Sequence, residues 1–102
     1  MELTSKQRAY LRSMAVDLDT ILMVGKGGIG ADVIKQADDA ILKREILKGK
    51  VLETAPVSPR EAAEELAQAV GAQVVQVIGT KFVLYRRNEK EPKIQLPKPA
   101  RR

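Results

Sequence analysis

A turn rich in glycine constrains the fold of this chain more than any other part of its sequence. It lies between the apolar residues 20–24 and a helical pattern that begins near Ala31, and it consists of Gly25, Lys26, Gly27, Gly28, Ile29 and Gly30. Because glycine has no Cβ, the backbone of such a turn can come close to an anion, and the helix behind it offers unpaired N–H groups and the positive end of its dipole. The order of strand, glycine turn and helix therefore predicts a phosphate-binding loop.

Three kinds of phosphate-binding loop fit parts of this turn. A P-loop needs Lys and then Ser or Thr directly after its last glycine, where this chain has Ala31 and Asp32, so that loop is excluded. A dinucleotide-binding loop fits the glycine spacing, and Glu53 stands where a ribose-binding acid is expected, but the chain is too short for the rest of that fold. The shorter GxxG pattern of residues 25–28 clamps a nucleic-acid backbone in KH-type domains. We favour the GxxG interpretation and keep dinucleotide binding as the alternative.

Length and composition limit the chemistry of the chain. Its 102 residues suffice for one domain with a modest core. It contains neither cysteine nor histidine, which removes disulfides, thiol and histidine catalysis and the usual zinc sites. We expect no enzyme activity, no catalytic residues, no metal and no cofactor. The polar N-terminus and the lack of a long apolar run predict a cytoplasmic protein with no signal peptide and no membrane contact.

Charge is unevenly distributed along the sequence. The net charge is +5, and residues 81–102 hold eight basic side chains against Glu89 and Glu91. Residues 53–65, in contrast, hold four glutamates against Arg60. A basic side and an acidic side are therefore expected, and the basic side suits a polyanion, although ordinary solvated charge would give the same pattern.

Hydrophobic periodicity predicts three helices and four strands. The helices are expected at residues 5–17, 31–43 and 59–70, and the strands at 20–24, 45–52, 74–78 and 82–85. Thr4 and Ser58 are predicted N-caps, because Gln7 and Glu61 follow three residues later and complete capping boxes. Helical crossovers favour parallel strands and the last hairpin adds an antiparallel pair. The predicted fold class is therefore α/β (α+β), a two-layer domain with a mixed sheet.

The C-terminal part of the sequence has no such periodicity. Residues 88–102 are rich in charge and proline, which predicts a flexible basic tail without core contacts after a single domain of residues 1–87.

Five segments carry a more specific signal through their order and spacing. They are Leu3–Arg8, Leu11–Arg12, Val24–Gly28, Glu45–Leu52 and Gln76–Arg86. Together they resemble the CRM domain, the chloroplast RNA splicing and ribosome maturation domain, and in particular its stand-alone bacterial form, the YhbY family. The resemblance covers residues 2–87. It departs from many members at Val16 and Arg44, where those members have histidine, so no role of these histidines is carried over.

The resemblance implies both a fold and a function. The implied fold is similar to the C-terminal domain of translation initiation factor 3, with a mixed four-stranded sheet in the order 1-2-4-3. The implied function is RNA binding through the GxxG loop and the adjacent basic surface. For the bacterial members it also implies association with precursors of the large ribosomal subunit.

We therefore predict a non-catalytic, monomeric RNA-binding protein that assists assembly of the large ribosomal subunit and has ribosomal RNA or its precursor particles as partner. A protein-interaction module is a further alternative. The aromatic side chains are few, which favours recognition of RNA shape and backbone over base stacking. The predicted RNA-binding residues are those of the loop and four cations around it: Gly25, Lys26, Gly27, Gly28, Ile29, Arg8, Arg12, Lys81 and Arg86.

Overall fold

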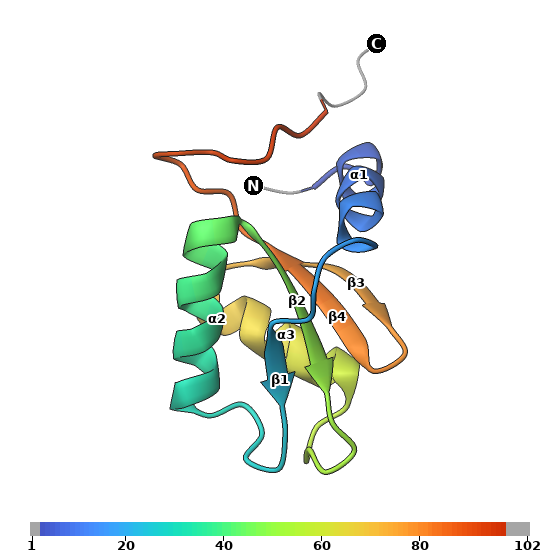
Figure 1. Cartoon of the computed structure of the whole chain (residues 1–102), viewed down its shortest axis with the longest axis vertical. Coiled ribbons are helices and arrows are strands. Elements are labelled where there is room, and N and C mark those ends of the chain that lie inside the picture. The colour runs from blue at the N-terminus through green and yellow to red at the C-terminus, as the bar shows by residue number, and fades with distance from the viewer. Residues whose placement is uncertain (1–2, 98–102) are drawn as a thin grey trace.

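Four strands form one mixed sheet, and three helices cover its two faces unequally (Figure 1). The computed structural model describes residues 3–97. In chain order the elements are α1 (Ser5–Ala15), β1 (Leu22–Val24), α2 (Ala31–Arg44), β2 (Ile46–Val51), α3 (Pro59–Val70), β3 (Gln73–Ile78) and β4 (Lys81–Tyr85). The strand order is β1-β2-β4-β3, with β1 and β2 parallel and β4 antiparallel to both of its neighbours. The predicted fold class and strand order are confirmed.

Local capping interactions set the helix boundaries. Gln7 N donates to Thr4 Oγ1 and Thr4 N donates to Gln7 Oε1, each at 3.1 Å, so the first predicted capping box is confirmed. Ser58 and Glu61 form the second, at 2.9 and 3.1 Å. α1 ends at Ala15, before the predicted residue 17. There the Lys48 ammonium donates to the carbonyl oxygens of Ala15 and Leu18, at 3.0 and 3.3 Å, and satisfies acceptors that the end of the helix leaves open.

The larger part of the core lies between the sheet and the pair α2 and α3. Successive residues of a strand point to opposite faces, so Leu47 joins this cluster while its neighbour Ile46 faces the other way. The buried sheet residues of the cluster are Leu22, Val24, Leu47, Val51, Phe82 and Leu84. These side chains hold both helices against the back of the sheet as it appears in Figure 1.

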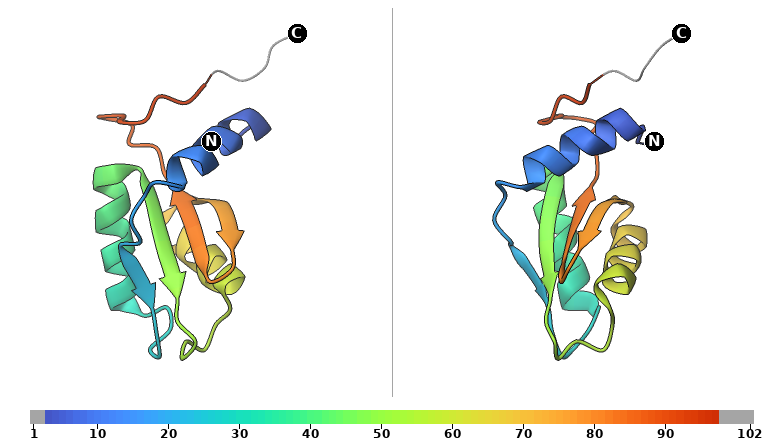
Figure 2. Two further views of the ribbon diagram at one scale, coloured as in Figure 1. Left: turned by 45° about the vertical axis from the view of Figure 1, so that its right-hand side comes forward. Right: turned by 90° about the vertical axis from the view of Figure 1, so that its right-hand side faces the viewer.

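α1 packs on the opposite face of the sheet. Its Leu11 and Ala15 join a second buried cluster with sheet residues that include Ile46, Val83 and Tyr85. In Figure 2, α1 crosses the end of the sheet that lies at the top of the view, while α3 lies lower, along the sheet, and the two helices contribute to different buried clusters. The structure therefore differs from the two-layer expectation, because α1 adds a partial third layer. It covers only part of its face, and the rest of that face remains open (Figure 1).

The segment that follows β4 is attached to the domain. Glu45 is fully buried, and its Oε1 accepts hydrogen bonds from Lys93 N at 2.8 Å and Ile94 N at 2.6 Å, while Oε2 accepts one from Asn88 N at 2.6 Å. Ile94 and Leu96 pack against the second cluster. The expectation that the tail lacks core contacts is therefore wrong for residues 88–97. Its flexibility stays a prediction, and residues 98–102 lie outside the described part.

Glycine at position 49 is required by packing. Gly49 is paired with Phe82 across β2 and β4, and both are buried. A Cβ on Gly49 would lie 2.4 Å from Phe82 Cζ and 2.8 Å from its Cε1, distances that force the ring out of its place in the core.

The first prediction concerns the attached segment. A chain ending at Asn88 loses two hydrogen bonds to the buried Glu45 carboxylate and the packing of Ile94 and Leu96. After the conformational entropy regained by the freed residues is subtracted, we expect the free energy of unfolding to fall by about 1–3 kcal/mol, or roughly 5–20 °C in Tm. A chain ending at Pro97 is the control, since it keeps all of these contacts. Equal melting temperatures of the two truncated chains in a thermal scan would contradict the prediction.

The second prediction concerns Gly49. Gly49→Ala should lower the free energy of unfolding by about 1–3 kcal/mol, because the added methyl group overpacks the core at Phe82. Gly27→Ala is the matched control, since no atom lies within 4 Å of its Cβ position, and it should change stability by less than about 0.5 kcal/mol. Urea denaturation measures both. A Gly49→Ala variant as stable as the control is incompatible with the proposed packing.

Candidate nucleic-acid interface

Residues 25–28 form a tight turn where β1 ends. Gly28 N donates to Gly25 O at 2.9 Å, and Gly28 has a φ of 68°. A Cβ on Gly28 would lie 3.0 Å from Pro56 Cγ, so this position requires glycine for both conformation and space. Gly27, in contrast, is exposed and has open space around it, and Lys26 beside it is also exposed. The turn thus presents accessible backbone and one cation to solvent.

The N-terminus of α2 opens into a hollow beside this turn. Gly30 is the N-cap and supplies no side chain to bond to the first N–H groups of the helix. The hollow has a volume of about 230 Å³ and is lined by Gly27, Gly28, Gly30, Ala31, Asp32 and Val33. Positive dipole charge and accessible N–H groups favour an anion there, while the carboxylate of Asp32 opposes one. Ile29 packs against the main core and is only partly exposed.

One row of side chains crosses all four strands on the face that α1 leaves open. Strand register pairs Met23 with Lys50, Lys50 with Lys81 and Lys81 with Ile78. Paired residues on adjacent strands project to the same face, so these four side chains form a continuous line, which we call the open row. Met23 and Ile78 are 54% and 62% exposed, unusually high for large apolar side chains of a sheet. The open row therefore combines two lysines with apolar surface.

The two lysines of the open row are a like-charge pair. Lysines directly opposite each other on neighbouring strands repel and reduce the stability of a sheet. Within residues 3–97, neither Lys50 nor Lys81 forms an ion pair, and the same is true of Lys26 in the turn. Leu52 N bonds to Val24 O at 2.8 Å, so β2 ends beside the start of the turn. Lys26 thus lies in the turn itself, while Lys50 and Lys81 lie side by side on the strands next to β1, from which the turn leads.

The other predicted cations lie elsewhere. α1 is at the opposite end of the molecule from the glycine turn (Figure 1), and its Arg8 donates a hydrogen bond from Nη1 to Val74 O. Arg12 is exposed on α1. Arg86 Nη1 bonds to Asp38 Oδ1 and to Val70 O, both at 2.7 Å, so its charge already links α2 to the end of α3. Of the four cations predicted around the loop, only Lys81 lies in the open row, which begins at Met23 on the strand that leads into the turn.

Sequence reasoning did not include Lys50 among the site residues. The two-residue period of a strand sets Lys48 and Lys50 on one face, and this much follows from the sequence alone. The sequence does not show which of the two lysines is available to a ligand. In the fold, Lys48 bonds to the end of α1 and to the residues after it, and strand register sets Lys50 beside Lys81. RNA contact by any of these residues stays a prediction.

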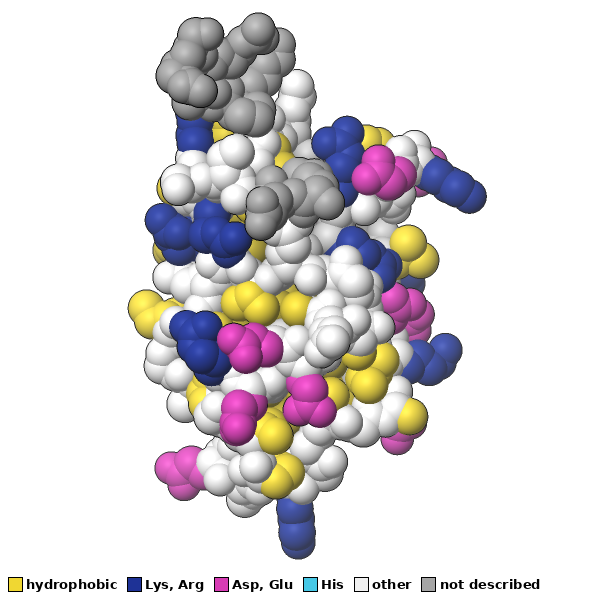
Figure 3. Space-filling model, turned by 180° about the vertical axis from the view of Figure 1, so that it is seen from behind, with side chains coloured by type: hydrophobic (Ala, Val, Ile, Leu, Met, Phe, Trp, Pro, Cys, Tyr) yellow, Lys and Arg dark blue, Asp and Glu magenta, His cyan; other side chains and the backbone are white. Residues whose placement is uncertain are grey.

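The opposite face of the molecule has a different charge. Viewed from behind, acidic side chains gather across the middle of the surface and basic ones toward its top (Figure 3). α3 contributes exposed glutamates there, and the hydrogen bond from Ser58 N lowers the pKa of Glu61 below its ordinary value, which keeps this carboxylate charged. A polyanion is therefore expected to avoid this face.

The described residues contain neither a cluster of potential metal ligands nor a helix suited to span a membrane. Across residues 3–97, no three or more His, Cys, Asp or Glu side chains are grouped so that they could hold a metal ion. No helix in that part of the chain has both the length and the apolar character needed to cross a membrane.

Known proteins resemble this chain over most of its length. The family model of the CRS1/YhbY (CRM) domain matches residues 3–86. A Bacillus subtilis protein named probable RNA-binding protein YqeI is 40% identical, over 93% of this chain and 99% of that protein. A Methanocaldococcus jannaschii protein, also named a probable RNA-binding protein, is 36% identical over 99% of this chain and 76% of that protein. The solution structure of a hypothetical Staphylococcus aureus protein, described as a candidate RNA-binding protein, has a TM-score of 0.79 and 44% identity over 94% of this chain and 100% of that one.

Proposed function

The chain belongs to the CRS1/YhbY (CRM) domain family, and we propose that it binds structured RNA across the glycine turn and the open row. The observation that carries this proposal is the group of three lysines without ion-pair partners, Lys26, Lys50 and Lys81, around a turn with accessible backbone. The names of the relatives, which are RNA-binding proteins, support the same ligand class.

Each part of this surface has a distinct task in the proposal. A phosphate binds at the accessible backbone of Gly27 and the N-terminus of α2. It can approach closely because Gly27 has no side chain. Lys50 and Lys81 neutralise neighbouring phosphates, and their mutual repulsion is relieved when an anion lies between them. Met23 and Ile78 supply apolar contacts to the sugars or to exposed bases. Such a surface reads RNA mainly through its backbone and shape.

The proposed target is RNA of the large ribosomal subunit or of its precursors, which the protein binds without catalysis during assembly. This part rests on the family resemblance and on the lack of histidine and cysteine in the chain. Crosslinking in cells, followed by sequencing of the bound fragments, tests it. Fragments dominated by large-subunit RNA support the proposal, whereas messenger RNA or no RNA argues against it.

The third prediction tests the glycine turn. Lys26→Asp combined with Gly27→Asp should reduce affinity for large-subunit RNA fragments at least about tenfold, or ~1.4 kcal/mol, because carboxylates replace a cation and obstruct the backbone. For the parent, three lysine–phosphate contacts predict a slope of log K against log salt of roughly −2 to −3. The slope for the variant should be less steep by about 0.7–0.9, because one of these contacts is lost. A salt titration of binding measures both quantities.

The control for this experiment changes the net charge by the same amount. Lys35→Asp with Gln36→Asp alters two exposed residues of α2 that do not line the hollow. If the loop variant stays folded by circular dichroism and loses no more affinity than this control, the turn is not the binding site. Saturable binding of a free dinucleotide by the parent would instead favour the alternative function.

The fourth prediction concerns Asp32 in the same hollow. Its carboxylate stands in the first turn of α2, where a phosphate is proposed to bind. Asp32→Asn should therefore raise RNA affinity by about two- to fivefold and lower the free energy of unfolding by about 0.3–1 kcal/mol through the helix dipole. Asp39→Asn, further along α2, should leave affinity within twofold of the parent. A loss of affinity in Asp32→Asn would exclude a phosphate at this end of α2.

A further inference from the structure

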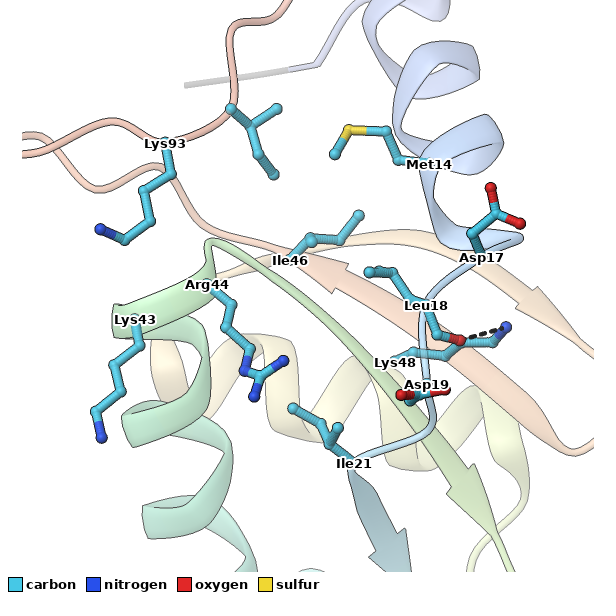
Figure 4. A pocket seen from close by; sticks show the side chains of 11 residues that line it. Met14, Asp17, Leu18, Asp19, Ile21, Lys43, Arg44, Ile46, Lys48 and Lys93 are labelled. Carbon is cyan, nitrogen blue, oxygen red and sulfur yellow. Dashed lines mark hydrogen bonds between the residues drawn. The ribbon is translucent and has the colours of Figure 1, made fainter.

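A second and larger hollow lies on the open side of the sheet, away from the glycine turn. Its volume is about 440 Å³, and it is set between the C-terminal ends of α1 and α2 (Figure 4). Its apolar lining comes from four separate segments of the chain: Met14, Leu18, Ile21, Ile46 and Ile94. A hollow of this size is in the range that accepts small organic groups.

The walls of this hollow are held by specific interactions. Lys48 Nζ bonds to Ala15 O and Leu18 O, which holds the end of α1 and the residues after it against β2. On the other side, the buried Glu45 carboxylate holds Lys93 N and Ile94 N, which places the Ile94 side chain at the hollow. The hollow is therefore formed before any ligand arrives.

Charge is divided across the rim. Lys43, Arg44 and Lys93 lie on the side of α2, and none of them forms an ion pair within residues 3–97. Asp17 and Asp19 lie on the other side, in the connection between α1 and β1. Figure 4 shows the Arg44 side chain directed from α2 toward Ile21. A ligand with one apolar, planar part and one anionic part would match this arrangement, with its anion toward α2.

The hollow continues the surface proposed for RNA. Ile21 lies two residues before Met23, on the extension of β1, and Lys48 lies two residues before Lys50 on β2. Residues two apart in a strand point to the same face and are about 7 Å apart, so the hollow adjoins the open row. An RNA strand on the open row would therefore pass the entrance of the hollow.

We propose that this hollow receives one unstacked nucleotide of the bound RNA. The base enters between the aliphatic side chains, while Arg44, with Lys43 and Lys93, binds its phosphate or stacks on the base. Apolar contact with a splayed base and an arginine at its phosphate or face are common elements of single-stranded RNA recognition. The inference rests on the proposed function, since it assigns a further contact to the same RNA.

Photo-crosslinking tests this contact separately from RNA binding as such. The probe is a pool of large-subunit ribosomal RNA fragments that contain 4-thiouridine, and crosslinked peptides of the full chain are identified by mass spectrometry. We expect crosslinks at residues 25–30 and also at Met14, Leu18 or Ile94. Arg44→Ala should lower RNA affinity about five- to tenfold and reduce the yield at the hollow relative to the turn. Lys35→Ala, which removes a cation elsewhere on α2, should change each quantity less than twofold, and Arg44→Lys should recover part of the affinity.

Each other outcome overturns the inference. Crosslinks at the turn with none at the hollow, or equal effects of Arg44→Ala and Lys35→Ala, would reject the nucleotide site and leave RNA binding intact. If a free nucleoside monophosphate removes the crosslinks at the hollow but not those at the turn, the hollow is a site for a free nucleotide instead. A parent protein that binds none of the RNA fragments would reject the proposed function, and this site with it.

Discussion

The buried carboxylate of Glu45 is the interaction on which several parts of this structure depend. A charge without water is costly unless hydrogen bonds replace its hydration, and here three backbone N–H groups from residues 88–94 do so. Glu45 also ends α2 in a left-handed conformation, with φ 67°, and its carbonyl accepts a hydrogen bond from Arg86 N at 2.9 Å. One residue therefore joins the end of α2, the start of β2 and the segment after β4. Burial, and then the negative charge of Glu45, raise the pKa of the adjacent Tyr85 hydroxyl.

The unequal cover of the two sheet faces determines where a polyanion can bind. α2 and α3 pack on one face, and the exposed glutamates of α3 make the outer surface of that helix acidic. On the other face α1 stops at Ala15, where Lys48 bonds to its last carbonyl group. The remaining surface keeps Lys50 and Lys81 uncompensated next to the glycine turn. Sequence-level charge counts could not separate these lysines from Arg86, whose charge is used inside the fold.

Much of the architecture could be predicted because it depends on neighbours in the chain. The capping boxes at Thr4 and Ser58 join residues three apart, and the period of apolar residues marks each helix and strand to within a few positions. The tight turn at residues 25–28 likewise follows from its glycines, and Gly28 has the positive φ that favours glycine. The family resemblance supplied the strand order, which such local patterns do not contain.

The sequence by itself determined the elements, the glycine turn and the family, because these are set by contacts within a few residues or by a shared pattern. The tertiary structure alone decided which charges remain available. Glu45 finds its N–H donors 43, 48 and 49 residues later, and Arg86 finds its carboxylate 48 residues earlier, in each case by packing of distant segments. The open row likewise exists only through the pairing of four strands. Strand register pairs residues that no local sequence pattern specifies. For this reason only the tertiary structure determines where the site lies.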